Sequence, residues 1–310
     1  MTALAVATLE TDLSGALELG GRALSFAEAQ QRPVLASASF HAEALVLGAL
    51  QREDTLRQRS PARFDVARVR RLTTGTEAQL SGPALYHALA LPRVDALFPD
   101  ASPRTLLNRN LRAFLRGYTA AGAPLRYFGT EVLALLGHPV ALIGYDRVDS
   151  GTLLIEVLVG LEHACVVRPA LKRELPAALL PLLRTSVAPH EYLRRIVAGI
   201  VERHGVGAED VAGTLLAQPT RAPTEPASGV VPASVSIPLG VVEAVARPEL
   251  ELTGDLLAST AALTRFARAV EASGAAGEPP EAARGALEGS PLDGARLPDL
   301  VQVIHAALAG

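Results

Sequence analysis

Residues 70 to 92 read Arg70-Arg71-Leu72-Thr73-Thr74-Gly75-Thr76-Glu77-Ala78-Gln79-Leu80-Ser81-Gly82-Pro83-Ala84-Leu85-Tyr86-His87-Ala88-Leu89-Ala90-Leu91-Pro92. The run from Val66 to Arg70 before it is predicted to be a strand, and His87 is predicted to lie on another strand. A histidine on such a strand is expected to be partly buried with satisfied hydrogen bonds. The stretch is thus expected to join two strands through a loop that contains Gly75.

Upstream, apolar residues recur at helical spacing and predict a helix, with Leu13, Ala16, Leu17, Gly20 and Leu24 on one side. Pro33 then precedes a predicted strand, 34–40, and a further strand is predicted at 45–48. The N-terminus is therefore interpreted as a helix followed by a strand.

Downstream, Ser102-Pro103 offers an N-cap and a first-turn proline for a helix whose predicted buried stripe is Leu107, Leu111, Phe114, Leu115 and Tyr118. Three short apolar runs follow at 132–136, 140–145 and 153–159, and they predict a three-stranded meander. Pro189 then begins a predicted helix with Leu193, Ile196, Val197, Ile200 and Val201 on one face, and Gly205 is placed to end it in a left-handed cap.

Residues 218–229 contain three prolines and no apolar periodicity, which favours a linker. Beyond it the pattern predicts a short β segment near 235–245, a helix with Leu263, Phe266, Ala267 and Val270 on one side, and a last helix from Pro298. We therefore expect an N-terminal domain over 1–217, a linker over 218–229 and a small α+β domain over 230–310.

The composition narrows the possible partners and locations. The chain has 310 residues and a formal net charge of -3, and charges of both signs are scattered along it, which argues against nucleic acid or a membrane as partner. Without a secretory signal or a long apolar run, a cytoplasmic location is expected. The single cysteine, Cys165, lies in an apolar stretch and is expected to be an inert core thiol.

In the order of its motifs the chain resembles the lipoate–protein ligase family. That family has a Leu-Gly-x-x-Gln turn, matched by Leu47-Gly48-Ala49-Leu50-Gln51, and then an Arg-Arg-x-Thr-Gly-Gly-x-Ala stretch leading to a His-Gly pair and a Tyr-Ser-x-x-x-Pro strand, similar to residues 70–92. Its Gly-Arg-Lys-Ile-x-Gly and His-Gly-Thr-Leu-Leu motifs correspond to residues 137–144 and 150–154. Its accessory-domain motif Gly-Asp-Phe-Phe reads Gly254-Asp255-Leu256-Leu257 here.

The resemblance implies a biotin/lipoate ligase-like α/β (α+β) fold, with a mixed sheet flanked by helices and a small accessory domain. It also implies a chemistry, in which ATP activates lipoate or a similar acyl chain and the acyl group passes to a lysine of a carrier domain. In such a site glycines allow backbone N–H groups to approach the phosphate, and a lysine stabilises the developing charge.

That lysine is missing from its motif. Its position is matched by Pro139, and the only lysine of the chain, Lys172, lies in Arg168 to Glu174, which is interpreted as the solvated start of a helix. Thr76 stands for the second glycine of the first motif, and Ser81 and Ser150 stand for the histidines of the two His-Gly pairs.

An arginine or histidine could replace the lysine, since a guanidinium can hold a carboxylate or phosphate with two hydrogen bonds. The alternatives are that Arg70 and Arg71 are ordinary strand-edge charges and that His138 is an exposed turn residue. The candidate ligand-binding residues are Arg70, Arg71, Thr74, Gly75, Thr76, Gly137, His138, Gly144, Ser150, Gly151 and Thr152.

Other chemistries find little support in the sequence. Residues 124–129 lack the nucleophile that cysteine-dependent octanoyl transferases need, and neither a metal-ligand cluster nor a Walker loop is evident. Two hypotheses follow. The first is a ligase-like pseudoenzyme that binds an acyl group, a nucleotide or a lipoyl-type carrier domain. The second is an active lipoate or octanoate ligase or transferase that uses ATP and a site rearranged around Arg70, Arg71 and His138.

Overall fold

The computed structural model describes residues 3–167, 175–204, 207–246, 249–273, 281–288, 290 and 292–309. The predicted helix start around Lys172 and the predicted cap at Gly205 lie outside these residues.

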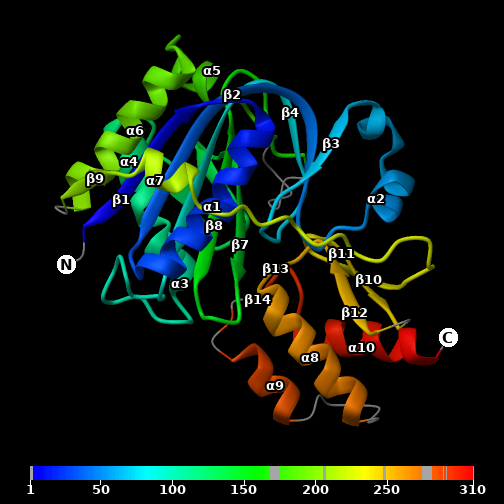
Figure 1. The fold of residues 1–310 in the computed structure, drawn as a ribbon. Coiled ribbons are helices and arrows are strands. Elements are labelled where there is room, and N and C mark those ends of the chain that lie inside the picture. Colours follow the sequence, from blue (N-terminus) through cyan, green and yellow to red (C-terminus); the bar gives the residue numbers. More distant parts are fainter. Residues whose placement is uncertain are drawn as a thin grey trace.

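A large mixed sheet organises the first two thirds of the chain (Figure 1). In the described residues it has nine strands in the order β5-β6-β7-β8-β4-β2-β1-β9, with β3 beside β2. β1 pairs parallel with β2 and β9, β3 pairs parallel with β2, and the other pairs are antiparallel. The strands are β1 (Leu4–Glu10), β2 (Val34–Leu47), β3 (Ala67–Arg70), β4 (Ala78–Leu91), β5 (Arg126–Tyr127), β6 (Val132–Leu135), β7 (His138–Arg147), β8 (Leu153–Gly160) and β9 (Ala208–Asp210).

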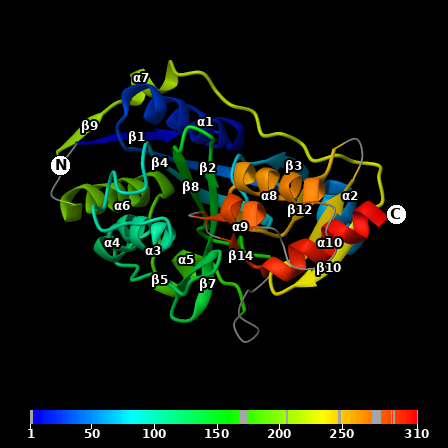
Figure 2. The same ribbon diagram turned by 90° about the horizontal axis from the view of Figure 1, so that it is seen from below.

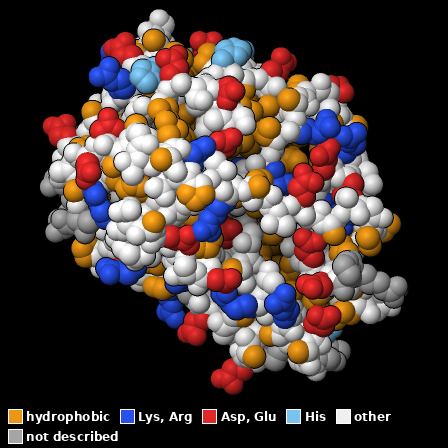
Figure 3. Space-filling view, viewed as in Figure 1, with side chains coloured by type: hydrophobic (Ala, Val, Ile, Leu, Met, Phe, Trp, Pro, Cys, Tyr) orange, Lys and Arg blue, Asp and Glu red, His pale blue; other side chains and the backbone are white. Residues whose placement is uncertain are grey.

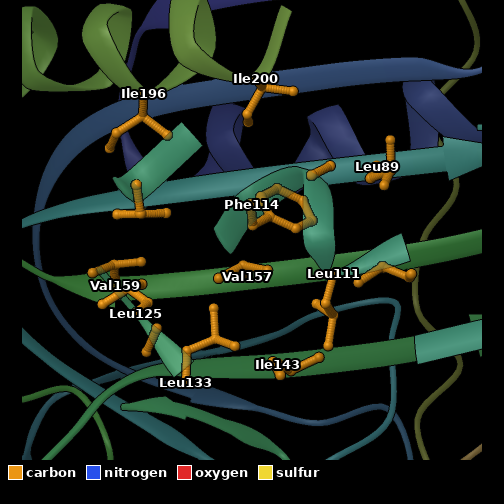
Figure 4. Packing of buried hydrophobic residues seen from close by; sticks show 14 of the residues in the cluster. Leu89, Leu111, Phe114, Leu125, Leu133, Ile143, Val157, Val159, Ile196 and Ile200 are labelled. Carbon is orange, nitrogen blue, oxygen red and sulfur yellow. The ribbon is translucent and has the colours of Figure 1, made fainter. Parts of the chain in front are cut away.

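Helices cover both faces of this sheet (Figure 2). Helix α1 (Leu13–Gln30) lies on one face, and α4 (Arg112–Ala120) and α6 (Pro189–His204) lie on the other. Phe114 of α4 and Ile196 and Ile200 of α6 pack over the strands in a fully buried layer (Figure 4). Shorter helices complete this part: α2 (Glu53–Arg59), the 3-10 helix η1 (Pro61–Asp65), α3 (Leu106–Asn110), α5 (Leu179–Leu183) and α7 (Ala212–Leu216).

The predicted meander and the helix from Pro189 are confirmed, as β6-β7-β8 and α6. Other predictions were wrong in detail. The segments predicted at 34–40 and 45–48 belong to one strand, β2, which ends at Leu47, because the polar residues His41 and Glu43 are exposed between buried neighbours. The strand β1 before the first helix was missed, since its alanine-rich sequence has weak β character.

The helix predicted after Ser102-Pro103 begins later, at Leu106. The backbone N–H of Ser102 donates to the Thr105 hydroxyl, which forms a turn before α3 instead of a cap at Ser102. The helix changes from α3 to α4 at Leu111, which keeps a right-handed helical backbone. Leu107, Leu111, Phe114 and Tyr118 are buried as predicted, whereas Leu115 of the same predicted stripe is only half-buried.

A smaller C-terminal part has its own sheet and hydrophobic cluster. Strands β10 (Ala233–Ile237), β11 (Gly240–Val245) and β12 (Glu251–Gly254) form an antiparallel sheet, and β13 (Leu257–Ala258) pairs with β14 (Leu292–Asp293). Helices α8 (Thr260–Ser273), α9 (Glu281–Leu287) and α10 (Leu297–Ala309) accompany them. The predicted face of α8 is buried, and the last helix begins one residue before Pro298. Residues 218–229 form neither helix nor strand.

None of the helices in the described part of the chain is long and apolar enough to span a bilayer. Acidic and basic side chains are interspersed over the face seen in Figure 3, as the scatter of charges in the sequence predicted.

Candidate functional site

The loop between β3 and β4, residues 71–77, lies against the middle of β7. The loop approaches Gly144 through the side chain of Thr73 and Gly48 through the backbone of Gly75, so closely that no side chain would fit at either glycine. A Cβ on Gly144 would lie 1.9 Å from the Thr73 hydroxyl, and one on Gly48 would lie 2.0 Å from the carbonyl oxygen of Gly75. Gly75 itself has φ of 106°, which favours glycine. Gly144 and Gly75 therefore serve close packing of this loop.

Four consecutive backbone amides of this loop donate to acceptors of the protein. Thr74 donates to the carbonyl of Tyr145 at 3.1 Å and Gly75 to that of Leu256 at 2.6 Å. Thr73 donates to the Glu156 carboxylate at 3.3 Å, and Thr76 to the Glu131 carboxylate at 3.0 Å. The loop has the glycine and the clustered amides of an anion-binding loop, and two carboxylates of the same chain are among its acceptors.

Both carboxylates are buried. Glu156 also accepts from the Tyr86 hydroxyl at 2.5 Å and from the Thr73 hydroxyl. Burial raises the pKa of Glu131 to about 7, although hydrogen bonds from Thr76 and the charge of Arg71 oppose the shift. Near neutral pH the protonated and the ionised forms of Glu131 are therefore populated to similar extents.

Arg71 is 1% exposed and faces these carboxylates. Its Nη2 donates to the carbonyls of Thr74 at 2.9 Å and Thr76 at 3.1 Å. Burial lowers its pKa, and the charges of Glu156 and Glu131 act in the opposite direction. The expectation of a strand-edge charge was thus wrong for Arg71, which is a buried cation that braces the loop.

Arg70 points elsewhere. Its Nη1 donates to the carbonyl of Gly48 at 2.7 Å and to that of Gln51 at 2.6 Å, so it holds the turn after β2. Neither arginine directs its hydrogen-bonded edge toward a free ligand surface.

The C-terminal part reaches into the same region through residues 254–258. The hydroxyl of Thr74 lies 2.8 Å from the carbonyl of Ala258 and accepts from the Ala258 amide at 3.0 Å. The buried carboxylate of Asp255 accepts from Gln51 at 2.7 Å and from Arg59 at 3.0 Å. The segment that resembles the family's Gly-Asp-Phe-Phe motif is therefore packed beneath the loop 71–77.

The turn that carries Gly137, His138 and Pro139 lies at the opposite end of β7. Six residues of strand separate His138 from Gly144, which is roughly 20 Å. His138 is half-buried, and its Nδ1 lies 3.0 Å from the carbonyl of Leu175, so it is not a freely exposed turn residue. Leu142 and Tyr145, further along β7, are fully buried.

Ser150, Gly151 and Thr152 form the turn between β7 and β8. The Ser150 hydroxyl donates to Glu28 of α1 at 2.6 Å, and Thr152 is buried beside it. Ser150 lines a cleft of about 780 Å³ between α1, the start of α8 and residues 221–224. Its lining includes the apolar residues Leu24, Leu72 and Leu154. It also includes charged residues of both signs: Arg221, Arg265, Arg268, Glu28, Asp146 and Asp149.

The sequence candidates therefore separate into three places. Arg71, Thr74, Gly75, Thr76 and Gly144 lie together at the loop, with Arg70 at the neighbouring turn after β2. Gly137 and His138 lie at the far end of β7, and Ser150 to Thr152 form the turn whose Ser150 lines the cleft. Sequence reasoning missed Glu131, Glu156 and Gln51. Glu156 could have been found, because it is the one charged residue in the apolar run 153–159.

Two other predictions concern buried groups away from the loop. His87 is fully buried and bonded to the hydroxyls of Ser37 and Tyr118, and burial lowers its pKa to about 3. Cys165 is buried as expected, which raises its pKa to about 11. Within the described ranges no group of three or more His, Cys, Asp or Glu side chains is arranged to hold a metal ion.

The fold resembles solved lipoate–protein ligases. The lipoate complex of LipL1 from P. falciparum gives a TM-score of 0.56 at 8% identity, covering 83% of this chain and 86% of that one. Lipoate-protein ligase A bound with ATP gives 0.51 at 11% identity, covering 69% of this chain and 92% of that one. The bi-partite lipoate protein ligase from Thermoplasma acidophilum gives a TM-score of 0.50 at 12% identity, covering 69% of this chain and 90% of that one.

No family model and no curated protein matches the sequence. The structural likeness establishes a biotin/lipoate ligase-type fold, as the sequence motifs predicted, and at these identities it establishes the fold alone.

Proposed function

We propose that this protein is a lipoate–protein ligase-like pseudoenzyme that acts by binding and does not adenylate. The observation that carries the proposal is the bonding of the amides of residues 73–76. An acyl-adenylating loop must offer such donors to phosphate and acyl oxygens, whereas here Glu131 and Glu156 accept two of them and backbone carbonyls accept the others.

The missing cation supports the same proposal. No lysine occurs in residues 1–171, so no register of the motif around Gly144 places one beside the loop. The Nη2 of Arg71 donates to carbonyls within the loop, whereas its Nε and Nη1 are buried without a hydrogen-bond partner among the described residues. His138 lies roughly 20 Å away along β7. A phosphate at the loop would therefore lie beside Glu131 and Glu156, and Arg71, the one candidate cation placed there, already faces these two carboxyl groups.

Binding is assigned instead to the cleft beside Ser150. Its volume of about 780 Å³ suits a small molecule, and its leucine side chains suit an acyl chain. An arginine of the lining that leaves its present carboxylate partner can pair with the carboxylate of that chain. Arg265 pairs with Asp149, which is largely exposed, so that this pair can open toward a ligand at low cost. The protein partner that would bring such an acyl group to the cleft is a lipoyl-type carrier domain.

Calorimetry with octanoate, lipoate and ATP, together with mass spectrometry for acyl-AMP, tests the proposal. We expect octanoate or lipoate to bind, ATP not to bind, and no acyl-AMP to form. Formation of acyl-AMP would refute the pseudoenzyme and favour the alternative of an active ligase with a rearranged site.

A pair of variants on one helix locates the ligand. Thr264 is exposed on α8 and lines the cleft, so Thr264→Trp should fill the cleft and abolish acyl binding. Glu271→Trp, at an exposed position two turns further along α8, is the matched control and should bind as the parent does. Equal binding by both variants would place the ligand elsewhere.

A further inference from the structure

Arginine is distributed unevenly in this chain. Residues 101–130 contain five arginines and no aspartate or glutamate, although the chain as a whole has a net charge of -3. Three of them, Arg109, Arg112 and Arg116, follow one another at spacings of three and four residues along α3 and α4, which continue through the helical Leu111. We call these three residues the arginine stripe.

Three other helices each pair an arginine with a glutamate four residues earlier. Arg22 pairs with Glu18 on α1 at 3.1 Å, Arg57 with Glu53 on α2 at 3.0 Å, and Arg195 with Glu191 on α6. On α4 the residue four positions before Arg116 is another arginine, Arg112. Like charges at this spacing destabilise a helix by roughly 0.2 to 0.5 kcal/mol, so the stripe opposes the stability of its own helix.

Local compensation of the stripe is small. Within the described part of the chain, Asp100 is the one carboxylate paired with the stripe. It lies 3.1 Å from Arg109 and 3.9 Å from Arg112, and its side chain is 57% exposed. Arg116 instead lies over the ring of Phe98, with 5.7 Å between the guanidinium carbon and the ring centre. The guanidinium groups therefore retain donors for an external acceptor.

The surface is also hollowed at this point. Arg112, Arg116, Leu115 and Thr119 line a depression of about 330 Å³. The Thr119 hydroxyl is already used, since it donates to the carbonyl of Leu115 at 2.7 Å. An occupant would therefore meet two guanidinium groups and an aliphatic floor, which fits an acidic side chain next to an aliphatic one.

We propose that the arginine stripe docks an acidic, amphipathic segment of a partner protein. Charge complementarity selects carboxylates, and Leu115 between the two arginines selects a partner whose carboxylates are interspersed with aliphatic residues. The stripe lies on the face of the sheet opposite α1 and away from the C-terminal part (Figures 1 and 2). It is thus separate from the cleft, and the inference does not depend on acyl binding there.

Fluorescence anisotropy with a labelled synthetic helical peptide of glutamate and leucine tests this inference on the full-length protein. We expect saturable binding that weakens as salt is raised, and at least about a tenfold loss of affinity in Arg112→Glu/Arg116→Glu. The matched control Arg194→Glu/Arg195→Glu removes the same charge from exposed positions of α6 and should bind nearly as well as the parent protein.

Three results would overturn the proposal. The first is that the peptide fails to bind the parent protein. The second is that both double variants lose affinity equally. The third is that either a single-stranded oligonucleotide or phosphatidylglycerol vesicles bind the stripe more tightly than the peptide does. Circular dichroism verifies that each variant is folded. Arg112→Gln/Arg116→Gln, which adds no repulsive charge, should give a smaller loss in the same direction.

Discussion

At the scale of single residues, Glu131 makes the loop sensitive to pH. Its pKa in the folded protein is about 7, above the ordinary value of 4.5, so the folded state holds an extra proton between these values. Its contribution to the free energy of unfolding is therefore complete below pH 4.5 and is lost as the pH rises through 7.

Glu131→Gln should remove this pH dependence, because glutamine stays neutral and can still accept from the Thr76 amide. We expect the variant to match the parent near pH 4.5 and to be more stable above pH 7, by up to about 3 kcal/mol, in urea unfolding at a series of pH values. Burial also raises the pKa of Asp146, to about 6. Asp146 contributes equally to the pH dependence of both proteins, so its effect cancels in the difference between their free energies of unfolding. Lower stability at pH 8 would instead show that Arg71 requires the carboxylate charge.

The paired arginines show how far sequence reasoning reaches at this scale. It marked Arg70 and Arg71 as candidates, but it could not tell that Arg71 would be buried. A buried guanidinium requires nearby carboxylates, and these come from Glu131 and Glu156, 60 and 85 positions further along the chain. Only the pairing of β7 with β6 and β8 brings them together.

At the scale of secondary structure, α4 carries a local electrostatic penalty that a single substitution should relieve. Arg112→Glu places an acidic residue four positions before Arg116, which converts a repulsive pair into an attractive one. We expect a gain in the free energy of unfolding of about 0.5 to 1 kcal/mol, larger at low salt, in chemical denaturation. A loss of stability would mean that the distant contact of Arg112 with Asp100 outweighs the repulsion.

Elements with clear periodicity were predictable. Helices α1, α6 and α8 are buried on one face, and the strands of the meander are buried between neighbouring elements. Both kinds of burial appear in the sequence as a regular spacing or a run of apolar residues. The strands β1 and β9 were not predictable, since their short sequences acquire strand structure only by pairing with each other and with β2.

At the scale of the whole molecule, the hydroxyl of Thr74 connects the large sheet to the C-terminal part. It lies 2.7 Å from the carbonyl of Tyr145 and accepts from the buried amide of Ala258. Thr74→Val keeps the shape and leaves that amide without its acceptor. We expect a loss of about 1 to 3 kcal/mol and faster hydrogen exchange in β13 and α8 than in β4.

Thr264→Val is the control for this prediction, because the Thr264 hydroxyl bonds only to the carbonyl of Thr260 within α8. It should leave exchange nearly unchanged. Equal acceleration over both parts in Thr74→Val would indicate that they unfold together. The proposed limits of the N-terminal domain, the linker and the C-terminal domain rest on the sequence pattern, and this experiment tests them as well.

The hydrogen bonds of the amides of residues 73–76 also determine whether the order of this loop depends on the concentration of a ligand. A loop ordered by a dissociable ligand gains stability with the logarithm of the ligand concentration. Here the acceptors belong to the same chain, and their effective concentration at the loop is set by the fold. Because the proposed function includes no ATP binding, we predict that the melting temperature of this protein stays constant across an ATP titration.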